Sequence, residues 1–464
     1  MMNPIFLIAF PLLAAFLSIL SKKLAPVLLL LIALLNTVIA IFIPMGIVGI
    51  GGFSFPYGIN LYVDTYAQIG LLLVNGLFTV IAILNIKKYK AYSSVLLVAL
   101  TGLNGLLLTG DLFNLFVFLE ISGIAAYLIT SSNKKPLSTF HYLVMGSVGS
   151  SLYLFGLIIL YSMFGTLNFM DMIHQIQVAS IEYTDLILPF FMMFVGLGVE
   201  AKLLPFNSWV KGVLKHSNTL SGPMVAGVYA AAISLVLGRL VHNLFLFEGK
   251  LYLVVVVLLV LGIVLGEAMA FASDNVKEIL LYSSISQACI TALLFVHGII
   301  IWAVYLIIAN GISKTLMFLV TNKAEEQIGN AKMDNLQGLF SNNKIIGIAF
   351  TIAALSVIGM PLFAGFVIKL NYLTVLAHLD QLVVISIILL SSIVEGIYFI
   401  RLLIKLWYPK DTDIEPIKFH LSYKIILGLM AAVLLVFGTY STPLNRLDNS
   451  IDQVSEEIEV IFHG

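Results

Sequence analysis

Charged residues, cysteines and clustered histidines are scarce in this sequence, and each shortage excludes a class of protein. Only 10% of the 464 residues are Asp, Glu, Lys or Arg, and the formal net charge is zero, so nothing indicates a nucleic-acid partner. Cys289 is the only cysteine, which excludes a cysteine-ligated iron–sulfur cluster within this chain and an internal disulfide. The eight histidines form no HxxxH or HxxE pattern. We therefore expect no cofactor or metal in this chain itself.

Apolar residues are present in excess: 60% of the chain is hydrophobic, more than a soluble protein of this length carries. A membrane-spanning helix needs about 20 apolar residues, and such runs recur along the whole chain. The first run is followed, not preceded, by Lys22 and Lys23, which is the reverse of a secretory signal and predicts a retained span. The sequence predicts an all-α polytopic protein embedded in the lipid bilayer.

The apolar runs predict about 14 transmembrane helices, of which two are interrupted by proline. Pro205 interrupts the seventh helix in KLLPFNSW, and Pro361 interrupts the twelfth in GMPLFAGF. The predicted spans are 4–20, 25–45, 62–86, 92–109, 112–131, 140–163, 185–209, 219–241, 251–273, 278–297, 299–321, 345–367, 380–407 and 422–441.

The order of the spans suggests an inverted repeat. Helices 4–8 (residues 91–245) and helices 9–13 (residues 246–410) form two units of five, and each has a proline-broken fourth helix. Broken helices in corresponding positions of inverted units are typical of an ion pathway at mid-membrane. Helices 1–3 (residues 1–90) precede the repeats, and a final helix with a short outer tail (residues 411–464) follows them.

Basic residues in the connecting loops predict the orientation in the membrane. Most of them follow odd-numbered spans, so the positive-inside rule places these loops in the cytoplasm and both chain termini outside. Residues 50–60 are too short and glycine-rich to span, and we interpret them as an outer hairpin. The few basic residues of the opposite side are Arg239, Lys250 and Arg446.

Three charged residues lie deep within apolar spans: Glu120, Lys314 and Lys369. A charge at mid-membrane costs about 2.5–3.5 kcal/mol on insertion scales, so such residues pair inside a bundle or carry ions. We predict that all three take part in a proton or ion pathway. Asp111 begins the same helix as Glu120, where a carboxylate complements the helix dipole, so we expect a structural role for it.

Further polar residues accompany the two broken helices. Glu200 and Lys202 precede Pro205 and project to opposite sides of a helix, so each needs a partner elsewhere, and Glu120 is the expected partner of Lys202. Glu395 lies within a span and His297 ends one near the outer face, and we include both in the predicted pathway.

Three charged residues are placed nearer the cytoplasmic surface. We expect Glu267 near the inner end of the ninth span, and Asp274 and Lys277 in a solvated turn.

Six segments together resemble the antiporter-like subunits of respiratory complex I, Mrp cation/proton antiporters and group 4 membrane-bound hydrogenases. They are DLFNLFVFLE, FHYLVMGSVGSSLYLFG, LLPFNSW, VKEILLYSSISQ, ISKTLMF and MPLFAGFVIK, and the resemblance covers about residues 90–410. It implies 14 core helices, a half-channel in each repeat and a central axis of lysines, histidines and glutamates. The segment VEGIYFIRL resembles subunits of archaeal hydrogenase and sulfur-reductase complexes.

The resemblance also implies partners: other antiporter-like and small membrane subunits, and peripheral hydrogenase-like or iron–sulfur subunits. Iron–sulfur clusters or a metal centre are expected in those partners. The resemblance also implies that the complex lies in a prokaryotic cell membrane.

The sequence departs from the family pattern mainly in its first half. Counting back from Pro205 and Arg239, the expected lysines fall on Glu200 and Ala231, and Asn310 stands where the family has a histidine. A shift of two residues, as for Lys202, is roughly 200° around a helix.

Three functions remain open at this point. The chain is an ion-translocating subunit of an energy-converting oxidoreductase moving protons or sodium ions, or a subunit of an Mrp-type sodium/proton antiporter without a redox partner. The third alternative is a structural or coupling subunit whose first half no longer pumps.

Overall fold

The computed structural model is an all-α bundle, and it describes residues 3–53, 57–178, 182–245, 247–409 and 418–439. Twelve helices in these ranges are long and apolar enough to cross a membrane, and Phe6–Leu20 and Lys344–Ile358 are shorter apolar helices. Each predicted span overlaps one of these helices, which confirms the polytopic helical class. The exact number that cross the membrane and the inverted relation of the two units stay predictions.

The elements of the first half follow the predicted spans closely. They are α1 (Phe6–Leu20), α2 (Ala25–Phe42), β1 (Gly46–Gly49), β2 (Asn60–Val63), α3 (Thr65–Asn85), η1 (Lys90–Tyr92), α4 (Ser93–Leu108), α5 (Leu112–Ser131), α6 (Pro136–Phe164), α7 (Phe169–Val178), α8 (Tyr183–Glu200), α9 (Ser208–Lys215), α10 (Ser221–Pro223), the π-helix η2 (Met224–Tyr229) and α11 (Ala230–Asn243).

The second half contains the remaining helices. They are α12 (Gly249–Phe271), α13 (Val276–Val296), α14 (Ile300–Ile328), α15 (Lys344–Ile358), α16 (Ala364–His378), α17 (Leu382–Trp407) and α18 (Leu421–Thr439). Of the predicted final region 411–464, only α18 and the residues just before it are described. The predicted outer tail lies outside the described residues.

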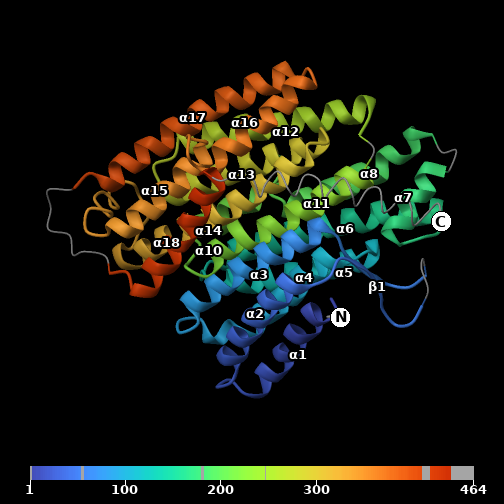
Figure 1. Cartoon of the computed structure of the whole chain (residues 1–464), viewed down its shortest axis with the longest axis horizontal. Helices are drawn as coiled ribbons and strands as arrows, with labels where there is room; N and C mark the ends of the chain where they lie inside the picture. Colours follow the sequence, from blue (N-terminus) through green and yellow to red (C-terminus); the bar gives the residue numbers. More distant parts are fainter. Residues whose placement is uncertain (1–2, 54–56, 179–181, 246, 410–417, 440–464) are drawn as a thin grey trace.

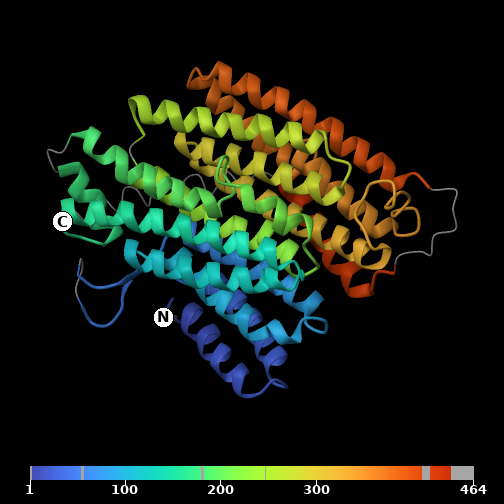
Figure 2. The same ribbon diagram turned by 180° about the vertical axis from the view of Figure 1, so that it is seen from behind.

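The helices are arranged across the bundle roughly in chain order. Figures 1 and 2 show α1 and α17 at opposite edges, with α13 and α14 in the interior. The last helix, α18, returns to pack on α14 and α15 instead of extending the row (Figure 1). The interior helices α13 and α14 are 89% buried, as is the segment Ser221–Asn243, so polar side chains on them depend mainly on protein groups as partners.

Both predicted helix breaks are present. Pro205 lies between α8 and α9, and Pro361 lies between α15 and α16. Left-handed backbone conformations accompany each break, at Lys202 (φ 65°) before Pro205 and at Gly359 (φ 84°) and Leu362 (φ 77°) around Pro361. A residue with positive φ ends a helix, and the carbonyl groups of the preceding turn are then left free for other donors.

One end of the bundle carries a small β-hairpin. Strands β1 and β2 pair antiparallel with Gly46 opposite Val63 and Gly49 opposite Asn60, so the predicted hairpin around 50–60 is confirmed for the described residues. The short helix α7, in a segment that we expected to be a loop, lies at the same end (Figure 1). Asp111 stands at the start of α5, as expected, and it also caps the helix, because its carboxylate accepts from the backbone N–H of Asn114 at 2.6 Å.

Candidate functional site

A chain of buried polar side chains crosses from α14 to α16 in the second half. Lys314 on α14 is 1% exposed, and its ammonium donates to Ser283 Oγ on α13 at 2.7 Å. The Ser283 hydroxyl in turn lies 3.4 Å from Glu395 Oε1 on α17. Glu395 Oε2 is 3.5 Å from the ammonium of Lys369 on α16. We call Lys314, Ser283, Glu395 and Lys369 the polar chain.

The helix break explains why Lys369 is held in place. Its ammonium donates to the carbonyl oxygen of Ile358, the last residue of α15, at 2.8 Å and to Ser392 Oγ at 2.9 Å. The left-handed Gly359 ends α15, so this carbonyl has no intrahelical partner and lies at the negative end of the helix dipole. The break therefore creates an ammonium-binding position inside the bundle.

Glu395 is almost fully buried at 1% exposure, and protein donors surround its carboxylate. Besides Ser283 and Lys369, Gln287 Nε2 donates to Glu395 Oε1 at 2.9 Å. Buried charges are stable only when they are paired and hydrogen-bonded, and Glu395 meets both conditions. Gln287 Oε1 also lies 3.4 Å from the Asn310 amide, so the residue at the family's histidine position joins this network.

Lys202 comes from the first broken helix, but its side chain reaches the second half. It is 1% exposed and donates to Ser284 Oγ on α13 at 2.9 Å. The helical conformation predicted for Lys202 was wrong, because α8 ends at Glu200 and Lys202 has a left-handed backbone. The expected ion pair with Glu120 is absent from the described part of the chain.

Lys202 and Lys314 line the same small cavity. Its volume is ≈ 30 Å³, which is enough for water. Polar groups line it beside alanines and glycines, so any water inside would have hydrogen-bond partners. The lining residues that matter here are Lys202, Lys314, Ser284, Gln287, Asn310 and Ala231. Lys202 thus lines the same cavity as Ala231, which stands where the family has its eighth-helix lysine.

Glu200 has tyrosines, not a lysine, as its partners. Its carboxylate accepts from the hydroxyl of Tyr142 at 3.0 Å and from that of Tyr127 at 3.3 Å. Tyr142 stacks on Trp209 with ring centroids 3.9 Å apart, which fixes the donor. Glu120 lies partly exposed on α5, and among the described residues it forms no ion pair with a lysine of the polar chain.

His297 lies at the end of α13, away from the polar chain. Its Nδ1 lies 2.7 Å from the carbonyl oxygen of Leu293, and its Nε2 lies 3.1 Å from the hydroxyl of Tyr252 on α12. The sequence therefore placed His297 correctly at a helix terminus. Its part in a pathway stays a prediction.

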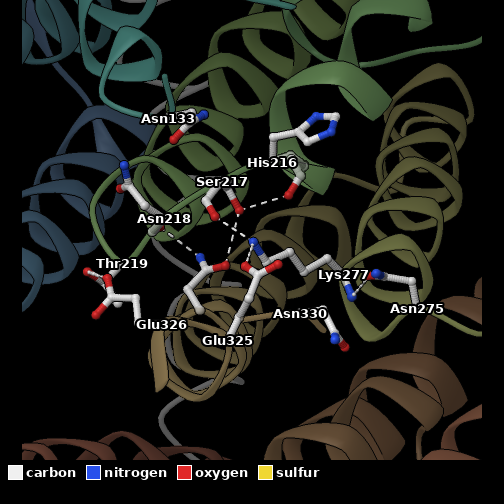
Figure 3. A network of polar contacts seen from close by, with 12 residues as sticks. Asn133, His216, Ser217, Asn218, Thr219, Asn275, Lys277, Glu325, Glu326 and Asn330 are labelled. Atoms are coloured by element: carbon white, nitrogen blue, oxygen red, sulfur yellow. Dashed lines mark hydrogen bonds and ion pairs between the residues drawn. The ribbon is translucent and has the colours of Figure 1, made fainter. Parts of the chain in front are cut away.

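A second polar network lies at the other end of α13, and it corrects the expectation for Lys277. The side chain of Lys277 is 1% exposed and forms an ion pair with Glu325, whereas Asp274 is exposed as predicted. Figure 3 shows Lys277 between Glu325 and Ser217, whose backbone carbonyl oxygen, in the segment after α9, accepts from the Lys277 ammonium. Asn322 donates to the carbonyl oxygen of Asn218 at 2.8 Å in the same network. These contacts join the first broken helix to α13 and α14.

Three polar residues of α13, namely Ser283, Ser284 and Gln287, were not among the predicted pathway residues. Their signal was present, because a polar run within LYSSISQ interrupts an otherwise apolar span. The structure shows that they hold Lys314, Lys202 and Glu395 respectively.

A family model described as "NADH:quinone oxidoreductase/Mrp antiporter, TM" matches residues 109–394, which is more than half of the chain. The chain belongs to this family. Membership confirms the resemblance inferred from the six sequence segments, and it identifies the chain as an antiporter-like, multi-pass membrane subunit.

Two curated relatives carry names that match the two parts of the family's description. The NADH-quinone oxidoreductase subunit N of Desulforudis audaxviator (strain MP104C) is 26% identical over 371 residues, covering 76% of this chain and 74% of that protein. A Na(+)/H(+) antiporter subunit of Bacillus subtilis (strain 168) is 26% identical over 428 residues, covering 88% of this chain and 85% of that protein.

Solved structures agree over nearly the whole chain. A chain of the membrane-bound sulfane sulfur reductase (MBS), an archaeal respiratory membrane complex, superposes with a TM-score of 0.90 at 29% identity, covering 98% of this chain and 99% of that chain. A chain of the Mrp complex from Dietzia sp. DQ12-45-1b has a TM-score of 0.87 at 18% identity, covering 96% of both chains, and shows the shared fold.

Proposed function

We propose that this chain is an ion-translocating subunit of a multi-subunit, energy-converting oxidoreductase, and that protons move along the polar chain. The observation that carries the proposal is the continuity of Lys314, Ser283, Glu395 and Lys369 through the buried interior. Four helices, α13, α14, α16 and α17, supply these groups, although apolar side chains would be less costly there. Lys202 extends the series across the cavity it shares with Lys314.

The geometry couples the charges of neighbouring groups. Glu395 lies between two lysines, in direct contact with Lys369 and one serine hydroxyl away from Lys314. Loss of a proton from either ammonium changes the electrostatic energy of the other two groups, since little water screens them. Proton arrival at one end therefore favours proton release at the other.

A single substitution tests the polar chain. In the complete complex, reconstituted into vesicles, Lys314→Met should lower proton translocation by about a hundredfold, the scale on which positioned proton-transfer groups act. Lys344→Met is the matched control, because Lys344 is an exposed lysine at the start of α15. Unchanged translocation in Lys314→Met would overturn the proposal and favour a structural or coupling subunit.

The proposed partners and orientation rest on the relatives and on the loop charges. MBS is a respiratory membrane complex and shares the fold over almost the full length of this chain. We infer partners of the same kind: other antiporter-like and small membrane subunits, and peripheral subunits that hold the iron–sulfur clusters or metal centre. Lysine-rich loops support cytoplasmic placement of one face, with both termini outside.

An Mrp-type sodium/proton antiporter is the second candidate. The similarity to the Na(+)/H(+) antiporter protein of Bacillus subtilis over 88% of this chain supports it. Purification of the native complex distinguishes the two functions. Iron–sulfur or flavin subunits that co-purify in fixed ratio support the oxidoreductase, whereas a complex without them that exchanges sodium for protons in vesicles supports the antiporter.

A further inference from the structure

Glu267 on α12 is a buried carboxylate that the polar chain does not include. Its side chain is 3% exposed, and Oε2 has no hydrogen-bond partner among the described residues. An ionised carboxylate left in this state costs several kcal/mol, because neither water nor a donor replaces its hydration. A carboxylate that serves only to hold helices together would be paired with a donor.

The packing of α12 directs Glu267 toward the polar chain. Gly266 lets α12 approach α13 closely, since a Cβ at this position would lie 3.0 Å from the backbone nitrogen of Ser286. The same helix packs on α17, which carries Glu395. Glu267 thereby interacts electrostatically with Glu395 and with Lys314.

Two hydroxyl groups surround the Glu267 carboxylate. Ser286 on α13 and Tyr398 on α17 are next to it, and the hydroxyl oxygens of both are buried without a hydrogen-bond partner in the described residues. Tyr398 is also next to Ser283, the serine of the polar chain. The titratable or charged groups that act on Glu267 are thus Glu395 and Tyr398 from α17 and Lys314 from α14, while α13 contributes the uncharged Ser286.

We propose that Glu267 is a proton-carrying residue that shares a proton with Glu395 on the neighbouring helix α17. When the Glu267 carboxyl group gives up its proton, the Glu395 carboxylate takes one up. The O–H bond lost at one carboxyl group is replaced by one formed at the other, so only these two groups change charge. The inference rests on the proposed function and adds a branch from the polar chain into α12.

The test uses the complete complex in vesicles. Glu267→Gln keeps the shape and polarity of the side chain but cannot carry a proton, so translocation should fall by about a hundredfold. Glu267→Asp retains a carboxyl group and should keep a measurable part of the rate. Glu248→Gln is the control, because Glu248 precedes the same helix and is exposed.

The outcomes separate this inference from the proposed function. Loss of translocation in both Glu267→Gln and Lys314→Met supports both, while loss in Lys314→Met alone overturns the role of Glu267 and leaves the polar chain standing. If Glu267→Gln does not assemble, infrared difference spectra of the wild-type and Glu267→Asp complexes decide. A protonated-carboxyl band that shifts in Glu267→Asp supports the inference, and an unchanged band overturns it.

Discussion

The ion pair between Lys277 and Glu325 allows a sharp prediction, because its two members differ in exposure. Lys277 is 1% exposed, whereas Glu325 is 28% exposed. Glu325→Gln leaves a fully buried ammonium with the carbonyl oxygen of Ser217 as its remaining partner, and breaking a buried pair in this way costs about 3–5 kcal/mol. Lys277→Met leaves a carboxylate that water reaches, so we expect a loss of about 1–2 kcal/mol.

The free energy of unfolding of the detergent-solubilised protein measures both losses. The double variant, Lys277→Met with Glu325→Gln, should be more stable than Glu325→Gln alone, because no unpaired buried charge is left. The exposed pair of Lys405 and Asp334 is the control, and Asp334→Asn should cost about 0–1 kcal/mol. Equal losses for the two single variants at the buried pair, or a double variant less stable than Glu325→Gln, would refute the reasoning.

Two further predictions concern packing at the helix breaks, and thermal unfolding checks both. Gly365→Ala would place a Cβ 1.7 Å from the carbonyl oxygen of Ser356, so it should destabilise the protein by about 1–3 kcal/mol. At Gly428 in α18 an added Cβ would have no atom within 4 Å, so Gly428→Ala should be neutral or stabilise the protein by up to about 1 kcal/mol. If Gly428→Ala destabilised the protein more than Gly365→Ala does, this packing would be contradicted. Trp209→Phe removes the indole N–H that donates to the Val199 carbonyl at 2.9 Å. The expected loss is about 1–3 kcal/mol, and an unchanged unfolding temperature would show that this bond contributes nothing.

The membrane spans and the broken helices could be predicted from the sequence because their signals are local. A proline within a long apolar run is visible without any knowledge of neighbours, and both Pro205 and Pro361 lie at observed breaks. Lys314 and Lys369 were recognisable for the same reason, since a lysine among apolar residues must be buried or reach a surface. Local patterns therefore located the buried charges.

Their partners could not be predicted, because they come from distant segments. The local sequence predicts that Lys277 lies in a solvated turn, whereas its burial depends on Ser217 and Glu325, which lie 60 and 48 residues away in the chain. Glu267 was placed near a helix end, but only packing against α13 and α17 shows that its carboxylate is buried. The side-chain direction of Lys202 was mispredicted for a different reason: its left-handed backbone breaks the helical periodicity from which that direction was predicted.

The position of Lys202 changes how the two halves of the protein relate. Glu200, at the position of a family lysine, is held by two tyrosine hydroxyls, and Asp64 pairs with Arg239. Among the described residues, therefore, no lysine forms an ion pair with a carboxylate of the first half. Lys202 follows it by two residues, yet the break turns its side chain to Ser284 and to the cavity of Lys314. The first broken helix therefore supplies a basic group to the second half, and the loss of lysines at Glu200 and Ala231 does not interrupt the line of ammonium groups from Lys202 to Lys369. The left-handed backbone of Lys202 thus places its ammonium at Ser284, in the second half, although the residue itself belongs to the first half.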